Sequence, residues 1–193
     1  MSSVSRIFLV GLMGAGKSTI GRLLAREFGL AFVDSDHEIE ARNGVPVATI
    51  FELEGEAGFR ARERKVIHEL TERDRIVLAT GGGAVIDPDN RRDLAARGFV
   101  IYLHARPENL FVRLRNDRSR PLLQTADPRG RLLQLYRERD PWYREVADLT
   151  VDTGRQSASK LARHIVTRIT TAADGSVDAG RAAFGEEAEA CDH

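Results

Sequence analysis

Residues 7–18 read IFLVGLMGAGKS, in which four apolar residues run directly into a glycine-rich turn. Residues 11–18 match the pattern G-x-x-x-x-G-K-[ST] at every fixed position. Glycines in this pattern let successive backbone N–H groups point at phosphate oxygens, and the lysine, here Lys17, reaches the β- and γ-phosphates. Apolar residues at helical spacing follow up to Phe28, and Gly29 is a typical helix stop. The sequence therefore predicts a nucleotide phosphate-binding loop (P-loop) between a buried strand and a helix.

The alternation of short apolar runs with longer helical patterns continues along the chain. It predicts βαβ units and a mainly parallel sheet. We therefore expect a single α/β domain over residues 1–171, a three-layer P-loop fold in which helices cover both faces of a central five-stranded parallel sheet. A charged helical stretch over about 37–73 is expected to break near residues 44–46 and 55–58. The strands are expected at residues 7–10, 31–33, 76–79, 99–103 and 149–151.

Composition narrows the classes of protein that this chain can represent. With 193 residues, 42% of them apolar, the chain can bury one core but has no room for two full domains. No apolar run is long enough to cross a membrane, and residues 1–6 lack the apolar region of a secretory signal. The single cysteine, Cys191, cannot form an internal disulfide. We therefore expect a cytoplasmic protein with no membrane partner. We also expect it to act as a monomer, although none of these observations decides the oligomeric state.

Charge is unevenly spread, although the formal net charge is zero. Residues 1–171 carry a net charge of +5, which suits an anionic ligand such as a nucleotide but falls short of the basic stripe of a nucleic-acid binder. We therefore expect small-molecule partners and no nucleic acid. Residues 172–193 are rich in Ala, Gly, Glu and Asp and are expected to form a disordered acidic tail. Residues 117–128 are polar and contain prolines, which predicts a mobile loop.

Three segments follow the first three predicted strands and should meet at one edge of the sheet, where open α/β sheets bind their ligands. They are the P-loop, residues 34–36 (Asp-Ser-Asp) and residues 81–83 (Gly-Gly-Gly). A kinase needs a group near Mg²⁺ and a base for the acceptor hydroxyl, and two carboxylates on one turn could divide these tasks. Ser35 and Glu38 also fit a capping box at the start of a helix, and this structural role and the catalytic role can hold at once. The three glycines either admit a ligand against the backbone or form a flexible turn.

A P-loop also occurs in GTPases, motor ATPases and nucleotide sensors. The third predicted strand lacks the acidic residue that many of these proteins carry at its end, which favours Asp34 as the residue near the metal. The chain has 26 arginines, so composition cannot single out Arg60, Arg120 or Arg139. The isolated histidines show no metal-ligand spacing and are interpreted as structural or surface residues: His37, His68, His104 and His164.

Taken together, these segments resemble shikimate kinases over about residues 5–170. The resemblance implies a nucleoside-monophosphate-kinase-like fold and an ATP-dependent phosphorylation of shikimate to shikimate 3-phosphate, with Mg²⁺ as the cofactor. Beyond the P-loop, it rests on an ordered set of motifs: Asp34-Ser35-Asp36, Phe59-Arg60-x-x-Glu63, Thr80-Gly81-Gly82-Gly83, Arg120-Pro121-Leu122-Leu123, Arg139 ahead of Tyr143, and Val151-Asp152-Thr153.

The resemblance also implies roles for individual residues. The catalytic set would be Asp36 as general base, Lys17 and Arg120. Ser18 and Asp34 would support the metal. Substrate contacts are implied for Asp36, for an Arg60–Arg139 clamp on the shikimate carboxylate with Glu63 orienting Arg60, and for the backbone N–H groups of Gly82 and Gly83. Nucleotide contacts are implied for Gly14, Ala15, Gly16, Lys17, Ser18, Thr19, Arg120 and Arg155.

The same resemblance implies a lid over about residues 114–127 and a substrate-binding helical region over about 36–62. Residues 154–157 read Gly-Arg-Gln-Ser, whereas the family often has a proline in its adenine-contacting stretch, which Arg155 and Arg113 would represent here. Two alternatives stay open. The chain could be another small-molecule kinase of the same fold, such as a gluconate or nucleotide kinase, or a non-catalytic ligand sensor. A sensor would typically have lost the P-loop lysine or the base, and both are present.

Overall fold

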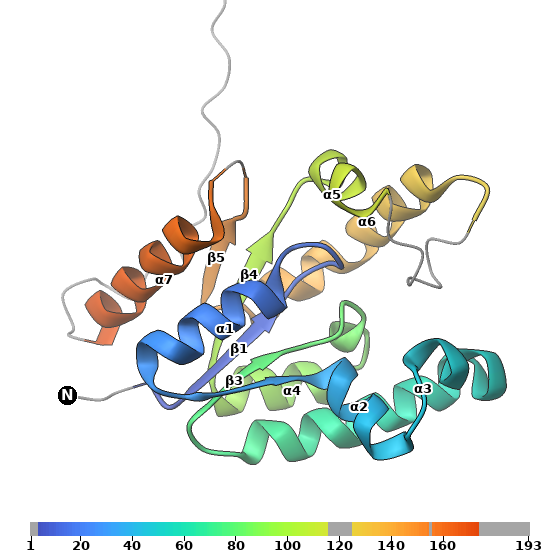
Figure 1. Cartoon of the computed structure of the whole chain (residues 1–193), viewed down its shortest axis with the longest axis horizontal. Coiled ribbons are helices and arrows are strands. Elements are labelled where there is room, and N and C mark those ends of the chain that lie inside the picture. Colours follow the sequence, from blue (N-terminus) through green and yellow to red (C-terminus); the bar gives the residue numbers. More distant parts are fainter. Residues whose placement is uncertain (1–3, 116–124, 155, 174–193) are drawn as a thin grey trace, which may run out of the picture.

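A computed structural model describes residues 4–115, 125–154 and 156–173 of the chain. At its centre lies a five-stranded sheet in the order β2-β3-β1-β4-β5, in which neighbouring strands pair in parallel (Figure 1). The prediction of a five-stranded parallel sheet is confirmed. The strands are β1 (Arg6–Val10), β2 (Ala31–Asp34), β3 (Ile76–Ala79), β4 (Phe99–His104) and β5 (Leu149–Asp152).

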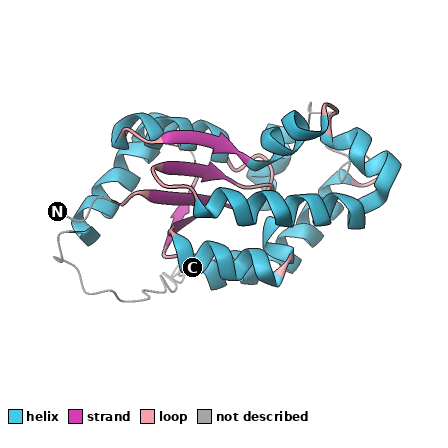
Figure 2. Ribbon diagram, turned by 90° about the horizontal axis from the view of Figure 1, so that it is seen from below, coloured by secondary structure: helices cyan, strands magenta, loops and turns pink. Residues whose placement is uncertain are grey.

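Helices cover both faces of this sheet, as the three-layer prediction requires (Figure 2). α1 (Lys17–Phe28) packs against α7 (Ala158–Ala173), while α4 (Pro88–Arg97) contacts both α3 (Val47–Glu72) and α6 (Pro128–Val146). Coverage on both sides explains why the central strands are continuous apolar runs without alternation. The four residues from Ile7 to Val10, for example, are fully buried.

The helical region after β2 is broken at two glycines, close to where the sequence predicted. α2 (Ser35–Asn43) ends at Gly44, and α3 is interrupted at Gly55; both glycines have a φ of 69°. This left-handed backbone suits glycine because glycine has no Cβ. The break in α3 brings Phe51 and Phe59, one on each side of it, into contact with ring centroids 4.6 Å apart.

The chain between β3 and β4 begins with the glycine turn and continues through η1 (Ala84–Ile86) into α4. Asp87 caps α4 by accepting a hydrogen bond from the N–H of Asp89, and Pro88 occupies the first helical position. An Asp followed by Pro is a typical start of a helix. The cap and the proline fix the far end of the glycine turn, so the turn is anchored at a strand on one side and at a capped helix on the other.

Parts of the predicted lid and tail fall outside the described residues, which leave out 1–3, 116–124, 155 and 174–193. The predicted site residues Arg120 and Arg155 are among the residues left out. α5 (Pro107–Leu114) and α6 border the predicted lid, and α7 reaches Ala173, past the predicted domain boundary at residue 171. In the ranges that are described, none of the helices combines the length and the apolar character needed to span a membrane.

Candidate active site

The P-loop wraps tightly around the N-terminus of α1. Gly14 and Gly16 have φ values of 76° and 95°, so glycine is required at both positions to let the backbone turn inward. Lys17 begins the helix, and its Nζ atom donates to the backbone carbonyls of Gly11 (2.6 Å) and Leu12 (2.9 Å). The lysine ammonium therefore lies across the loop, beside the positive end of the α1 dipole, where an anion is favoured.

Asp34 connects the P-loop to the turn after β2. One of its carboxylate oxygens accepts a hydrogen bond from the Ser18 hydroxyl (2.6 Å), and the other accepts from the Asp36 N–H (3.1 Å). His37 Nδ1 lies 3.5 Å from the same oxygen that accepts from Asp36. The sequence led us to expect the P-loop and residues 34–36 at one edge of the sheet, and the hydrogen bond from Ser18 to Asp34 joins the two segments there.

The predicted capping box at Ser35 is wrong, because Asp34 is the N-cap of α2. Ser35 is already the first helical residue and is fully buried. Its hydroxyl instead accepts a hydrogen bond from the N–H of Gly81 at 2.9 Å. The reason is topological: β2 and β3 are neighbours in the sheet, so the turn after β2 lies against the glycine turn after β3. Ser35 therefore ties these two turns together.

The oxygen atoms of Ser18 and Asp34 fit a magnesium ion that also binds nucleotide phosphates. Mg²⁺ usually keeps several waters and takes one or two protein carboxylates along with substrate phosphates. Among the residues that the structure describes, no cluster of three or more His, Cys, Asp or Glu side chains could hold a metal ion. A site that shares its metal with phosphates and water does not need such a cluster.

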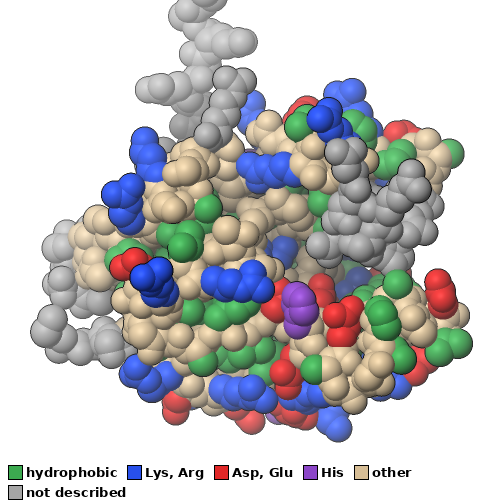
Figure 3. Space-filling model, in the orientation of Figure 1, with side chains coloured by type: hydrophobic (Ala, Val, Ile, Leu, Met, Phe, Trp, Pro, Cys, Tyr) green, Lys and Arg blue, Asp and Glu red, His purple; other side chains and the backbone are tan. Residues whose placement is uncertain are grey.

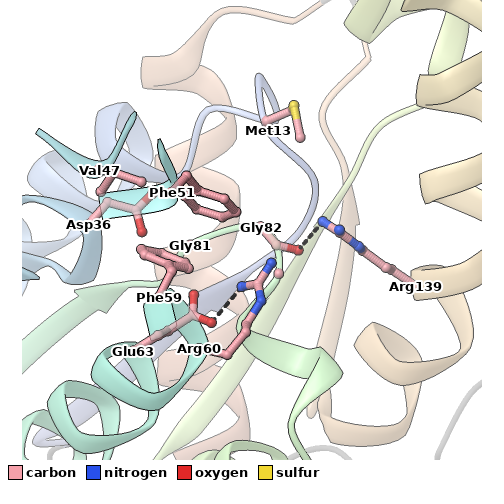
Figure 4. Close-up of a pocket in the computed structure, with 11 residues that line it drawn as sticks. Met13, Asp36, Val47, Phe51, Phe59, Arg60, Glu63, Gly81, Gly82 and Arg139 are labelled. Carbon is pink, nitrogen blue, oxygen red and sulfur yellow. Dashed lines mark hydrogen bonds and ion pairs between the residues drawn. The ribbon is translucent and has the colours of Figure 1, made fainter. Parts of the chain in front are cut away.

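Two adjoining hollows open at this edge of the sheet. In Figure 3 the corresponding face is hollowed, and acidic side chains and a histidine lie along the rim. The first hollow, here called the phosphate hollow, is lined by P-loop residues that include Lys17 and Ser18 and by Asp34, Asp36 and His37. The second, the arginine pocket, contains both guanidinium groups predicted to bind a carboxylate and is drawn in Figure 4. Residues that line it include Asp36, Phe51, Phe59, Arg60, Glu63, Gly81, Gly82, Gly83 and Arg139.

Asp36 lines both hollows, together with Met13, Val47 and Gly82. The carboxylate at position 36 therefore stands between the P-loop lysine and the two arginines. A molecule in the arginine pocket that presents a hydroxyl to Asp36 would have that hydroxyl directed toward the phosphate hollow. This is the geometry that transfer of a phosphoryl group to a hydroxyl requires.

The two arginines enter the pocket from different elements and have different partners. Arg60, on α3, pairs with Glu63 (2.6 Å) and with Glu56 (3.0 Å). Arg139, on α6, is only 3% exposed and donates to the carbonyl of Gly82 at 3.1 Å (Figure 4). Sequence reasoning did not identify Glu56, whose place one helical turn before Arg60 was the available signal.

Burial changes the acid–base properties of the pocket. Removal from water raises the pKa of the Glu63 carboxyl to about 7, and the positive charge of Arg60 opposes this rise only in part. Burial lowers the pKa of the Arg139 guanidinium. The pocket therefore contains a carboxyl group that can gain or lose a proton near neutral pH.

Other groups approach the backbone of the glycine turn closely, so flexibility is not all that the glycines provide. A Cβ atom on Gly83 would overlap the guanidinium of Arg60, and one on Gly82 would lie 3.2 Å from the backbone N of Met13. The glycines are needed because other groups approach the backbone closely. The interpretation of residues 81–83 as a merely flexible turn is wrong.

Arg113 links the P-loop to the segment after β5. Its guanidinium donates to the carbonyl of Gly14 (3.3 Å) and to the carbonyls of Thr153 (3.0 Å) and Gly154 (3.1 Å). Arg113 therefore lies beside both the P-loop and the predicted adenine-contacting stretch, and its contact with adenine stays a prediction.

A P-loop at the carboxyl edge of a parallel sheet, an acid on the wall of the phosphate hollow and a second, arginine-lined pocket define a small-molecule kinase of the P-loop class. The family model for shikimate kinase matches residues 13–170. The chain belongs to the shikimate kinase family.

Individual shikimate kinases are similar to this chain over most of its length. A shikimate kinase of Thiobacillus denitrificans is 61% identical over 163 residues, covering 84% of this chain and 89% of that protein. One of Burkholderia lata is 55% identical over 168 residues, covering 87% and 91%. Among solved structures, a shikimate kinase from Acinetobacter baumannii in complex with shikimate is 48% identical, has a TM-score of 0.86 and covers 88% of this chain and 95% of that chain. A gluconokinase from Sinorhizobium meliloti (18% identical, TM-score 0.60) shares the fold alone.

Proposed function

We propose that this chain transfers the γ-phosphoryl group of ATP to the 3-hydroxyl of shikimate, giving shikimate 3-phosphate and ADP. Membership of the shikimate kinase family supports this activity. The observation that carries the proposal is the position of Asp36 on the wall shared by the phosphate hollow and the arginine pocket. The working protein is proposed to be a cytoplasmic monomer.

The arginine pocket suits the carboxylate of shikimate. Two guanidinium groups, those of Arg60 and Arg139, offer planar donor sets that match a carboxylate. The backbone N–H groups of Gly82 and Gly83 are proposed to add further donors. With the carboxylate held at this end, a ring hydroxyl is proposed to reach Asp36.

Asp36 is proposed to accept the proton of that hydroxyl as its oxygen attacks the γ-phosphorus. The new oxygen–phosphorus bond forms as the bond between the γ-phosphorus and the bridging oxygen of ADP breaks. Lys17 and the P-loop N–H groups stabilise the charge that develops on the phosphate oxygens. Ser18 and Asp34 are proposed to hold Mg²⁺, which neutralises phosphate charge when it is bound.

The remaining contacts are proposed from the sequence and its resemblance to the family. The P-loop residues 14–19 are proposed to bind the nucleotide phosphates, with Arg155 near the adenine. Arg120, on a lid over about residues 114–127, is proposed to reach the phosphates when the lid closes and excludes water. Excluding water would suppress hydrolysis of ATP in the absence of shikimate.

An acceptor screen tests the proposed activity against the alternatives. The purified protein is mixed with Mg-ATP and, in separate reactions, with shikimate, its methyl ester, gluconate and nucleoside monophosphates, and ADP release is followed. We expect turnover with shikimate and at least about 100-fold lower kcat/KM with the methyl ester, because Arg60 and the buried Arg139 would lack their charged partner. Preference for gluconate or a nucleotide would establish another small-molecule kinase. Binding of shikimate without ADP release would establish a sensor.

A further inference from the structure

Tyr143 is a buried residue of α6 for which the proposed reaction has no assigned task. Its side chain is fully buried, and its hydroxyl donates a hydrogen bond to the carbonyl of Gly82. That carbonyl belongs to the glycine turn that lines both the arginine pocket and the phosphate hollow. The hydrogen bond from Tyr143 can therefore affect the orientation of the backbone that lines the site.

Two backbone hydrogen bonds close the glycine turn, from the N–H of Ala84 to the Gly81 carbonyl (3.1 Å) and from the N–H of Ile86 to the Gly83 carbonyl (3.0 Å), but neither involves the Gly82–Gly83 peptide. With no Cβ atoms, successive glycines rotate about φ and ψ with little steric penalty. The orientation of each peptide must therefore come from its hydrogen-bond partners. The Gly81 N–H has Ser35 as its acceptor, and the Gly82 carbonyl has Tyr143 and Arg139 as its donors.

The Gly82 carbonyl and the Gly83 N–H belong to the same planar trans peptide and point in opposite directions. Whatever holds the carbonyl toward α6 therefore also sets the direction of the Gly83 N–H. Arg139 alone would not hold the Gly82 carbonyl once substrate binds, because its guanidinium is the group that a substrate carboxylate would engage. When Arg139 shares its donors with a carboxylate, Tyr143 is left to hold the carbonyl.

The surroundings of Tyr143 keep its hydroxyl in position. Its ring stacks on that of Tyr102, with centroids 5.0 Å apart, and the Tyr102 hydroxyl donates to Asp140 at 2.8 Å. Asp140 in turn accepts a hydrogen bond from Arg144 at 2.7 Å. Burial raises the pKa of Tyr143, so its hydroxyl stays protonated and remains a donor at neutral pH.

We propose that Tyr143 is a positioning residue that fixes the Gly82–Gly83 peptide, so that the Gly83 N–H and Arg139 can bind the substrate carboxylate at the same time. This inference rests on the proposed function for the identity of the substrate. It assigns Tyr143 no contact with the reacting atoms. Its effect is on substrate affinity, and the phosphoryl transfer step is left to other residues.

The test is Tyr143→Phe, which removes one hydroxyl and keeps the ring that stacks on Tyr102. We expect the KM for shikimate to rise about 3–30-fold, as for one lost hydrogen bond to a shared acceptor, with the KM for ATP unchanged and kcat within about threefold. The matched control is Tyr136→Phe, since Tyr136 is on the same helix and bonds to His104 (3.0 Å), away from both hollows. This control should leave both KM values unchanged. An equal rise in the KM for shikimate and for ATP in Tyr143→Phe would overturn the proposal.

A double variant separates positioning of the peptide from positioning of Arg139. If Tyr143 acts through the peptide, adding Tyr143→Phe to Arg139→Lys raises the KM for shikimate further by a similar factor. If Tyr143 acts only through Arg139, the second substitution has no further effect, and the proposal is overturned.

A readout without substrate keeps this inference distinct from the proposed function. In ¹H–¹⁵N spectra, Tyr143→Phe should shift the Gly83 amide signal and speed its hydrogen exchange, while Tyr136→Phe should not. Unchanged Gly83 exchange would overturn the role of Tyr143 even if the wild-type enzyme phosphorylates shikimate. If Gly83 exchanges faster in Tyr143→Phe but the wild-type enzyme does not phosphorylate shikimate, the proposed function and its substrate are overturned. The role of Tyr143 in fixing the Gly82–Gly83 peptide would still be supported.

Discussion

The carboxylates of Asp36 and Glu63 converge on one point beside Gly81. A Cβ atom at position 81 would lie 2.6 Å from Asp36 Oδ1 and 2.8 Å from Glu63 Oε1. Asp36 comes from the start of α2 and Glu63 from the second half of α3, so this glycine lets two acids from different helices reach the same pocket. The negative charge of Asp36 adds to burial in raising the pKa of Glu63.

Gly81→Ala should therefore damage the site more than its small size suggests. The added methyl group would push both carboxylates away, and a displacement of about 1 Å at reacting groups can cost about 100-fold in rate. We expect kcat/KM for shikimate to fall by about 100-fold or more, with a loss of stability of about 1–3 kcal/mol from overpacking.

The control for this change is Gly44→Ala. A methyl group at position 44 would meet no neighbouring group within 4 Å, so this variant tests backbone strain alone, because the φ of Gly44 is 69°. It should lower the melting temperature while leaving the KM for shikimate near the wild-type value. If Gly81→Ala behaves like this control, then the close approach of the two acids has no functional importance.

Glu63 should make stability depend on pH in a predictable direction. Its pKa is raised by burial from 4.5 to about 7, so the folded state binds a proton that the unfolded state has already lost between these pH values. The stability associated with Glu63 is fully present below about pH 4.5 and is lost as the pH rises toward 7. The Glu63→Gln variant has no titrating group at this position, so it should not lose this stability as the pH rises.

Urea unfolding of the wild type and Glu63→Gln at pH 5 and pH 8 measures the effect. Other titrating groups cancel in the difference between the two proteins. Between these pH values the wild type should lose on the order of 2–3 kcal/mol relative to the variant. A constant difference in the free energy of unfolding would show that the pKa of Glu63 is not raised.

Sequence reasoning could locate the P-loop because that motif combines several fixed positions with a strand before it and a helix after it. It could also place the strands, since continuous apolar runs between glycines leave few other interpretations. The convergence of the turns after β1, β2 and β3 followed from the parallel sheet alone. Local motifs and short-range periodicity carry this kind of information.

The partners inside the site could not be predicted in this way. Ser35 fitted a capping box, yet contact with Gly81, 46 residues further along, decides its role. Composition could not single out Arg60 and Arg139 among 26 arginines; the family resemblance implied that they act together, and the fold brings them to one pocket. Tyr143 lies four residues after Arg139, so a helical projection places both on the same face. The sequence does not indicate that both donate to the carbonyl of Gly82.

Glu56 should weaken the binding of shikimate. It pairs with the guanidinium of Arg60 at 3.0 Å and its side chain is 54% exposed, so it competes with an incoming carboxylate for the same donors. Glu56→Gln should lower the KM for shikimate by about 2–5-fold, an effect of the size expected for a partly exposed ion pair. The KM of the variant should also rise more steeply with salt concentration than the wild-type KM, because salt then screens an attraction to Arg60 that repulsion by Glu56 no longer offsets.

The matched control is Glu54→Gln, which breaks an ion pair with Arg62 (2.6 Å) on the same helix but outside both hollows. It should leave the KM for shikimate unchanged. A higher KM in Glu56→Gln would reverse the interpretation, since it would mean that Glu56 orients Arg60 for the substrate.

The central claim is that Asp36, between the two hollows, accepts the proton of the attacking hydroxyl. It is tested most directly by single-turnover phosphoryl transfer from ATP to shikimate in the wild type and in Asp36→Asn. Both proteins are first shown to be folded and to bind Mg-ATP equally. We predict that the variant transfers the phosphoryl group about 10²–10⁴-fold more slowly. A rate within threefold of the wild type would contradict the account, because the proton would then have another acceptor.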